Sequence, residues 1–267
     1  MTGPVVTKAP AEIRRFTDID FLMLSVWGAL VVLFFAIKMT PFFHWAIFGS
    51  TVLVARNVWS LIRGRPVNHG DLCLAALTPI FTVVDGIALA WVTAFTPRTY
   101  DALLAQWDFG VEAAVRAWAI NNHLMPFIQA IYDSLPMVVL MVICLTSGIT
   151  RSRLLWSCFL GAVLCIPCYL LFPAVGPIHA GDPRAGRNCM PSMHLTWAML
   201  LWVNSKGWLR WITGAYVLLT VLSTLATGEH YVLDLVAAIP WTWFLSVLAR
   251  KWSLLPSAHG FGLAPQE

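Results

Sequence analysis

The chain has 267 residues, of which 59% are hydrophobic and 11% are charged, and its net charge is +4. Soluble globular domains carry about 25% charged residues, so this chain has too few charges to cover a surface in contact with water. The composition excludes a soluble protein and indicates that the lipid bilayer is the solvent. The sequence has no basic run and no polar face, which also excludes nucleic acid as a partner. We expect one bundle of helices and no second domain.

Apolar runs long enough to cross a membrane begin at residue 21. A transmembrane helix needs roughly 17–25 apolar residues to cross about 30 Å of hydrocarbon. The first run is longer than a signal-peptide core and no small-residue cleavage site follows it, so we expect a retained span. The runs predict an all-α, polytopic transmembrane helix bundle with about seven or eight spans: Phe21–Ile37, Phe42–Ile62, Leu72–Phe95, Pro126–Ser147, Leu154–Phe172, Pro191–Asn204, Trp208–Ala226 and Tyr231–Ala249.

Two segments depart from a plain membrane span. The segment from Tyr100 to Ala119 alternates charged and apolar residues at helical spacing, which predicts an amphipathic helix lying at the membrane interface. The run Pro191–Asn204 would reach only about 21 Å at 1.5 Å per residue. Either its helix extends beyond Asn204, or its start is recessed into the membrane. A recessed start would place Ser192 and His194 in a cavity below the membrane surface.

Lysine and arginine residues set the expected orientation, because they are enriched in cytoplasmic loops. We expect a multi-pass protein of the cell (inner) membrane with both termini in the cytoplasm. The loop from Pro173 to Cys189 and the turn Gly228–His230 then lie on the extracytoplasmic side. In this topology the cytoplasmic side holds twelve of the 17 basic residues, namely Lys8, Arg14, Arg15, Arg56, Arg63, Arg65, Arg151, Arg153, Lys206, Arg210, Arg250 and Lys251.

Two short segments on the predicted outer side carry the candidate catalytic residues. Ser192 and His194 open one helix, and His230 and Asp234 open another. Pro191 suits a first helical turn, where its missing N–H costs nothing. Each helix start offers free backbone N–H groups and the positive end of a helix dipole, so two helix N-termini converge from the same side.

An anion site is predicted beside these helix starts. Arg184 and Arg187 precede Pro191 in an outer loop that is otherwise poor in basic residues. Guanidinium groups bind phosphate through paired hydrogen bonds. Together with Ser192 they would hold the phosphate of a substrate.

His230 and Asp234 are four residues apart, so they share one face of a helix. A carboxylate there can accept from one imidazole nitrogen and leave the other free to attack. His194, from the other helix, could protonate a leaving oxygen. This set suits phosphoryl transfer through a phosphohistidine intermediate.

Several other residues have a structural explanation beside a functional one. Asp133 lies in the outer half of its span and either contacts a substrate head group or makes a structural pair, and a structural pair is favoured for Asp85. Cys165 and Cys168 have the spacing of a redox or zinc motif, but packing is favoured for both. Cys189 is the one cysteine in a polar loop and has no obvious mate.

These motifs together resemble the type 2 phosphatidic acid phosphatase superfamily. Pro191-Ser-Met-His194 matches its Pro-Ser-x-His motif, and His230-x-x-x-Asp234 matches its last motif, which begins at Ser223. The segment Phe172-Pro-Ala-Val-Gly-Pro177 and the residues around both motifs resemble the inositol phosphorylceramide synthase-like branch. The resemblance covers the six spans from Leu72 to Ala249.

The resemblance implies a role for each matching residue. His230 would be the nucleophile, Asp234 its orienting carboxylate and His194 the general acid, with Ser192 and basic residues around the phosphate. The chain departs from the family pattern at Thr224, where the last motif usually has Arg. The family's first motif has no clean match in the outer loops, because Arg65-Pro66 lies on the cytoplasmic side in the predicted topology.

The spans and the resemblance predict four parts of the chain. We expect a cytoplasmic N-terminal tail (1–20), two accessory transmembrane spans (21–71), a six-helix catalytic core (72–250) and a cytoplasmic C-terminal tail (251–267). The expected partner is a lipid phosphate substrate within the bilayer, with no cofactor and no metal. Hydrolysis and transfer remain open, because they differ only in whether water or an alcohol accepts the group. The alternative is a non-catalytic lipid-binding or transport protein on the same scaffold.

Overall fold

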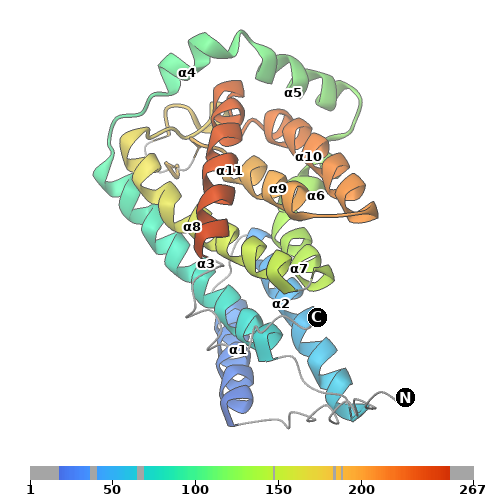
Figure 1. Ribbon diagram of the computed structural model, residues 1–267. Coiled ribbons are helices and arrows are strands. Elements are labelled where there is room, and N and C mark those ends of the chain that lie inside the picture. The colour runs from blue at the N-terminus through green and yellow to red at the C-terminus, as the bar shows by residue number, and fades with distance from the viewer. Residues whose placement is uncertain are drawn as a thin grey trace.

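The computed structural model describes residues 18–36, 41–64, 69–146, 148–182, 185–187 and 189–252. Within these ranges the regular structure is helical throughout (Figure 1), which confirms the predicted all-α bundle. A short 3-10 helix, η1 (Pro177–His179), lies between α8 and α9. The α-helices in chain order are α1 (Asp18–Ala36), α2 (Pro41–Ile62), α3 (His69–Phe95), α4 (Asp101–Asp108), α5 (Val111–Asn121), α6 (Met125–Asp133), α7 (Leu135–Leu145), α8 (Gly148–Leu171), α9 (Met193–Asn204), α10 (Trp208–Thr227) and α11 (Val232–Trp252).

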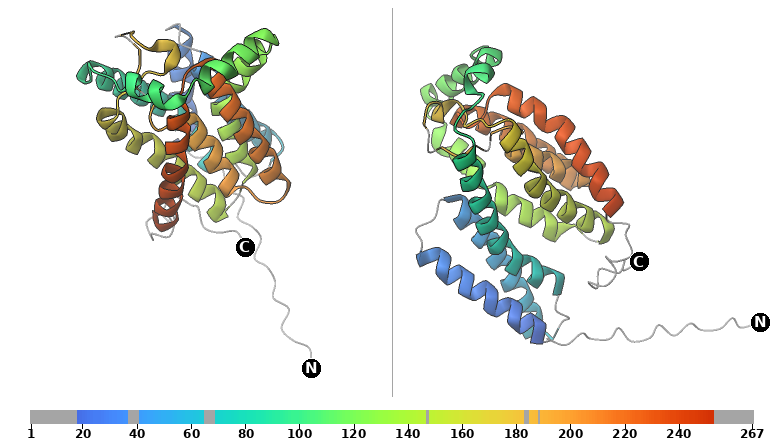
Figure 2. Two further views of the ribbon diagram at one scale, coloured as in Figure 1. Left: turned by 90° about the horizontal axis from the view of Figure 1, so that it is seen from above. Right: turned by 90° about the vertical axis from the view of Figure 1, so that its left-hand side faces the viewer.

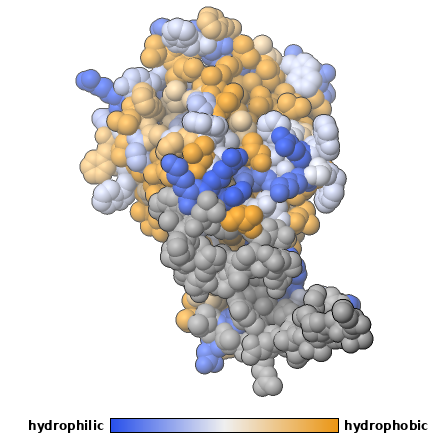
Figure 3. Space-filling model, in the orientation of Figure 1, coloured by the Kyte–Doolittle hydropathy of each residue, from blue (hydrophilic) through white to orange (hydrophobic). Residues whose placement is uncertain are grey.

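Four helices, α3, α8, α10 and α11, are each long and apolar enough to cross a membrane. Their outward faces carry large apolar side chains, and Trp211, Leu218 and Trp243 are 83%, 72% and 71% exposed. Hydrophobic side chains also cover much of the face shown in Figure 3. A soluble protein rarely exposes so large an apolar area. The outward faces of these helices are therefore suited to contact with lipid.

The run predicted as one span from Pro126 to Ser147 forms two helices, α6 and α7, with a bend of 50° between them. The break falls at Ser134, whose hydroxyl donates to the Ile131 carbonyl at 2.8 Å. Pro136 lies in the first turn of α7, where its missing N–H and its ring favour a new helix start over a continuous helix.

The described residues hold up to five spans if α6 and α7 count as one, compared with the seven or eight predicted. In α1 and α2 the apolar stretches within the described residues are shorter than a full span. Helix α9 ends at Asn204 and has 12 residues, so the helix does not extend beyond Asn204, and a recessed start remains the prediction for it.

The main core lies where α7, α8, α9 and α11 meet. Leu154 of α8, Leu200 and Leu201 of α9 and Leu245 of α11 are completely buried there. Lipid is as apolar as leucine, so these contacts hold helices together by close packing more than by removal from solvent. The packing fixes the position of α9 relative to α11, the two helices that carry the catalytic motifs.

Helices α1 and α2 lie at one side of this core (Figure 2). Leu53 and Val54 of α2 pack with Ala75 of α3 and Leu140 of α7 in a second buried cluster. Gly49 of α2 allows this contact, because a Cβ atom there would overlap the Leu140 side chain. The two N-terminal helices therefore pack against α3 and α7. Neither of those helices carries the motif residues.

The predicted amphipathic segment from Tyr100 to Ala119 forms two helices, α4 and α5, that lie across one end of the bundle (Figure 1). The chain turns between them at Phe109 and Gly110, which both have positive φ, 53° and 74°. Phe109 is 83% exposed, whereas Asp101 and Asp108 are buried. The apolar side chains on the outer face of these helices are thus exposed, while acidic residues face the bundle.

We predict that the end of the bundle covered by α4 and α5 faces away from the cytoplasm, because the basic residues gather at the other end. Ala180 and Lys206 are exposed positions near the two ends. In a variant without the six native cysteines, Ala180→Cys should react with a membrane-impermeant thiol reagent in intact cells. Lys206→Cys should react only after permeabilisation. The reverse labelling pattern would overturn the orientation.

Candidate active site

The first turns of α9 and α11 lie against each other and bring the two motifs together. The Ser192 backbone N–H donates to the Asp234 carbonyl at 3.2 Å. Ser192 is also the N-cap of α9, and its hydroxyl oxygen accepts from the Leu195 N–H at 3.4 Å. This residue, predicted to bind phosphate, is completely buried. In the structure it caps one helix and joins it to the other.

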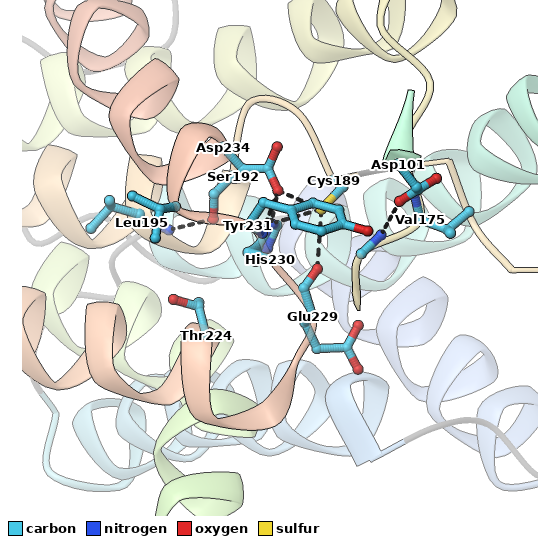
Figure 4. A network of polar contacts seen from close by, with 12 residues as sticks. Asp101, Val175, Cys189, Ser192, Leu195, Thr224, Glu229, His230, Tyr231 and Asp234 are labelled. Atoms are coloured by element: carbon cyan, nitrogen blue, oxygen red, sulfur yellow. Dashed lines mark hydrogen bonds and ion pairs between the residues drawn. The ribbon is translucent and has the colours of Figure 1, made fainter. Parts of the chain in front are cut away.

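His230 and Asp234 form the centre of the site (Figure 4). His230 Nδ1 lies 3.6 Å from Asp234 Oδ2, and the two residues are 4% and 0% exposed. The same carboxylate oxygen accepts from the Tyr231 N–H at 2.8 Å. A carboxylate in the first turn of a helix satisfies an N–H group that the helix itself leaves unpaired. The start of α11 is therefore bonded to the same oxygen atom that lies beside the His230 ring.

His194 faces His230 from α9. The centroids of the two imidazole rings are 6.1 Å apart. Tyr132 of α6 stacks on the His194 ring, with centroids 3.9 Å apart and an interplanar angle of 18°. The two rings are therefore close enough to contact one small group together.

Cys189 also contacts the His230–Asp234 pair. Its Sγ atom lies 2.7 Å from Asp234 Oδ2 and 3.3 Å from His230 Nδ1, and it also reaches the Glu229 carbonyl at 3.1 Å. Burial raises the pKa of this thiol well above its ordinary value, and the Asp234 carboxylate beside it raises the pKa further. The thiol is therefore a protonated donor at neutral pH. The sequence marked it only as the one cysteine in a polar loop, since its partners lie 40–45 residues further along the chain.

Cys189, His230 and Asp234 also offer metal-ligand atoms, which lie within 4.8 Å of one another. Cysteine, histidine and aspartate are suitable ligands for zinc. A metal bound by Sγ would displace the thiol proton, whereas the contacts described above are those of a protonated thiol beside Asp234.

The residues predicted to bind phosphate lie in different places. Arg184 is outside the described residues. Arg187 is 3% exposed, and its guanidinium donates to the carbonyls of Thr96 (3.3 Å), Asp182 (3.4 Å) and Ala185 (2.7 Å). These contacts support the loop before α9. A role in phosphate binding remains a prediction for both arginines.

Two further sequence positions can be placed. Asp133, the predicted head-group contact, accepts from the Gln129 side chain at 3.1 Å, while its neighbour Tyr132 is the residue of α6 that stacks on His194. Thr224 stands where the family usually has Arg, and it is completely buried. Its hydroxyl donates to the Thr220 carbonyl one turn earlier, at 2.8 Å.

Two carboxylates of α4 hold the loops around the site, and the sequence analysis missed both. Asp101 accepts from the N–H groups of Val175 and Gly176, each at 3.1 Å. Asp108 accepts at 2.8 Å from the N–H of Val232, the first residue of α11. The two acids are seven residues apart, a spacing that places them on one helix face. This spacing was the signal that could have identified them.

Gly176 allows the loop after α8 to pass close to the turn before α11. It has a positive φ of 86°, and a Cβ atom there would collide with the Glu229 carbonyl. Only glycine combines this conformation with so close an approach. The loop that carries Cys189 is therefore held against the His230 turn.

A family model described as the PAP2 superfamily matches residues 101–248, which include α4 and every residue of the site. The match covers more than half of the chain, and the chain belongs to this superfamily. Its members are phosphatases and phosphotransferases, so phosphoryl transfer is the chemistry that the family supports. No curated protein and no solved structure matches the chain. The closer resemblance to the inositol phosphorylceramide synthase-like branch stays a prediction, because the match is to the superfamily as a whole.

We predict that Asp108→Ala destabilises the protein by about 1–2 kcal/mol, because it leaves the first N–H of α11 without its acceptor. Thermal unfolding of purified protein in detergent measures this effect. Gln106→Ala, on the exposed face of the same helix, is the matched control and should leave the midpoint unchanged. Equal midpoints for the two variants would show that Asp108 does not hold α11.

Proposed function

We propose that the protein is a membrane-embedded lipid phosphatase or phosphotransferase that works through a phosphohistidine at His230, on the extracytoplasmic side. The observation that carries this proposal is the pair of imidazole rings 6.1 Å apart, one of which has a buried carboxylate beside Nδ1. Membership of the PAP2 superfamily supports the reaction class. The apolar bundle supports a substrate that stays in the bilayer.

In the first step His230 Nε2 attacks the phosphorus atom of the substrate. The bond from phosphorus to the leaving oxygen breaks as the N–P bond forms, and His194 gives that oxygen a proton. Asp234, beside Nδ1, favours the tautomer that keeps the proton on Nδ1 and stabilises the positive charge that develops on the ring. The anionic phosphate between the rings favours the protonated form of His194 before the step.

In the second step the oxygen of water or of an alcohol attacks the phosphorus atom. The N–P bond breaks, His230 recovers its lone pair, and His194 takes the proton from the attacking oxygen. In this proposal, backbone N–H groups in the first turn of α9 stabilise the charge that develops on the phosphoryl oxygens. Arg184 and Arg187 are the proposed side-chain contacts to those oxygens, and Asp133 is a proposed contact to the head group.

An apolar groove beside the site supports a lipid as the substrate. It has a volume of about 290 Å3 and lies between α8 and α11. Met190 and Pro191 line it just before the start of α9, and Ala237 and Pro240 line it on α11. Ala237 is one turn beyond Asp234, so an acyl chain in the groove would have its phosphate close to the two histidines.

The roles of the two histidines can be separated by the leaving group. An alkoxide needs a proton to leave and an acidic phenol does not. We predict that His194→Ala keeps relatively more activity on an aryl phosphate than on a lipid phosphate. His230→Ala should abolish both activities, and Asp234→Asn should weaken both without loss of the fold. Released phosphate and newly formed lipids are measured with purified protein and a panel of lipid phosphates and phosphodiesters.

A phosphohistidine trapped without acid and located by mass spectrometry should map to His230. Its presence on His194 would reverse the two roles. Full activity of His230→Ala would end the enzymatic proposal. Specific lipid binding with no turnover by the wild-type protein would favour the non-catalytic alternative.

We also predict that Ala237→Phe lowers kcat/KM for a long-chain lipid phosphate by about tenfold or more relative to an aryl phosphate, because a displaced chain misplaces the phosphate. The matched control is Ala88→Phe, in a second apolar groove of about 330 Å3 between α3 and α8. That groove is not lined by motif residues. Equal losses on both substrates in Ala237→Phe, or the same selective loss in Ala88→Phe, would show that the groove beside Pro191 does not hold the chain.

A further inference from the structure

Cys189 occupies a central position in the site that the proposed reaction has not used. It lies three residues before Ser192 and is 1% exposed. Its Sγ atom is within reach of two acceptors, Asp234 Oδ2 at 2.7 Å and the Glu229 carbonyl at 3.1 Å, and it lies 3.3 Å from His230 Nδ1. A thiol has one proton, and it can serve only one of these acceptors well at a time.

The thiol and the imidazole compete for the same carboxylate oxygen. Asp234 Oδ2 already accepts from the Tyr231 N–H, and the Cys189 thiol is its second close donor. His230 Nδ1 is 3.6 Å away, which is longer than a hydrogen bond between nitrogen and oxygen. In this arrangement the thiol, and not the imidazole, is the side-chain donor to Asp234.

The reaction changes what His230 requires from Asp234. A neutral imidazole gains little from a hydrogen bond to the carboxylate. The cationic ring of a phosphohistidine has an Nδ1–H that forms a strong, charge-assisted hydrogen bond to a carboxylate. If the thiol kept its bond to Oδ2, it would oppose that contact. The Glu229 carbonyl, 3.1 Å from Sγ, gives the thiol proton a second acceptor, and Gly176 packs closely against this carbonyl.

We propose that Cys189 is a positioning residue whose thiol proton alternates between two acceptors. It donates to Asp234 Oδ2 while His230 is neutral, and to the Glu229 carbonyl when His230 carries the phosphoryl group and donates to Oδ2. The thiol keeps its proton throughout, and no bond to sulfur forms or breaks. This inference rests on the proposed function, since it describes how the same site supports the charge on His230.

The simpler explanation is that Cys189 only fills space. It packs with Leu104, Ala174 and Tyr231 in a small buried cluster, and buried cysteine commonly behaves as a small apolar residue. The two explanations differ in what serine should do. Serine restores a donor at the same place, whereas a purely apolar contact would be better served by alanine.

Three variants test the proposal, each assayed for kcat and KM on a lipid phosphate and an aryl phosphate. Cys189→Ala should lower kcat by about ten- to a hundredfold, the size expected for one lost hydrogen bond to a charged group, with little change in KM. Cys189→Ser should recover most of that loss. Cys165→Ala removes another buried thiol, one that bonds only within its own helix in the described structure, and should retain wild-type kcat. Thermal unfolding of each variant checks the fold.

A double-mutant cycle with Asp234→Asn separates positioning from packing. If Cys189 acts through Asp234, Cys189→Ala should cause little further loss of kcat in the Asp234→Asn background. Losses that multiply, a serine variant no better than alanine, or wild-type kcat in Cys189→Ala would each overturn the inference. Its failure is distinct from failure of the proposed function, which would appear as full activity in His230→Ala whatever the Cys189 variants do.

Discussion

The site depends on one buried carboxylate. Asp234 is completely buried in the first turn of an apolar helix, where an ionised group is costly unless other groups compensate its charge. The Tyr231 N–H, the Cys189 thiol and the His230 ring meet at Oδ2. Its other oxygen, Oδ1, has no hydrogen-bond partner among the described residues. The negative charge is thus only partly compensated, and a cation on His230 is the change that would complete the compensation.

The same device, a carboxylate that accepts backbone N–H groups, recurs around the site. Asp101 holds the loop after α8, and Asp108 holds the first N–H of α11. Loops and helix starts expose N–H groups that regular structure cannot satisfy, and carboxylates are strong acceptors for them. This explains why α4 buries Asp101 and Asp108 while Leu103 and Trp107 are exposed at the end of the bundle. It also links the position of His230 to a helix more than one hundred residues away.

Much of this architecture could be predicted from the sequence, because long apolar runs and two short motifs are local signals. The helices of the bundle follow from those runs. The prediction that His230 and Asp234 share one face of a helix was wrong, because α11 begins at Val232 and His230 lies in the turn before it, although the two side chains still meet. The break at Ser134 and the turn at Phe109 were missed, since both depend on a few residues within an otherwise helical pattern. Cys189 and the acids of α4 were missed for a different reason. Their partners are distant in sequence, so only the tertiary fold shows what they contact.

At two positions linked to binding of the phosphate anion, the side chains donate to backbone carbonyls of the protein. Thr224 replaces an arginine of the family pattern and donates its hydroxyl back to its own helix. The Arg187 guanidinium already donates to three loop carbonyls, so contact with a phosphate would add to these bonds or replace some of them. The described residues also offer the N–H groups in the first turn of α9, which includes His194. Because the N-cap Ser192 bonds to Asp234, this helix start is fixed relative to His230. An anion bound there would lie beside His194, the second residue of α9, and its negative charge would stabilise a proton on that ring.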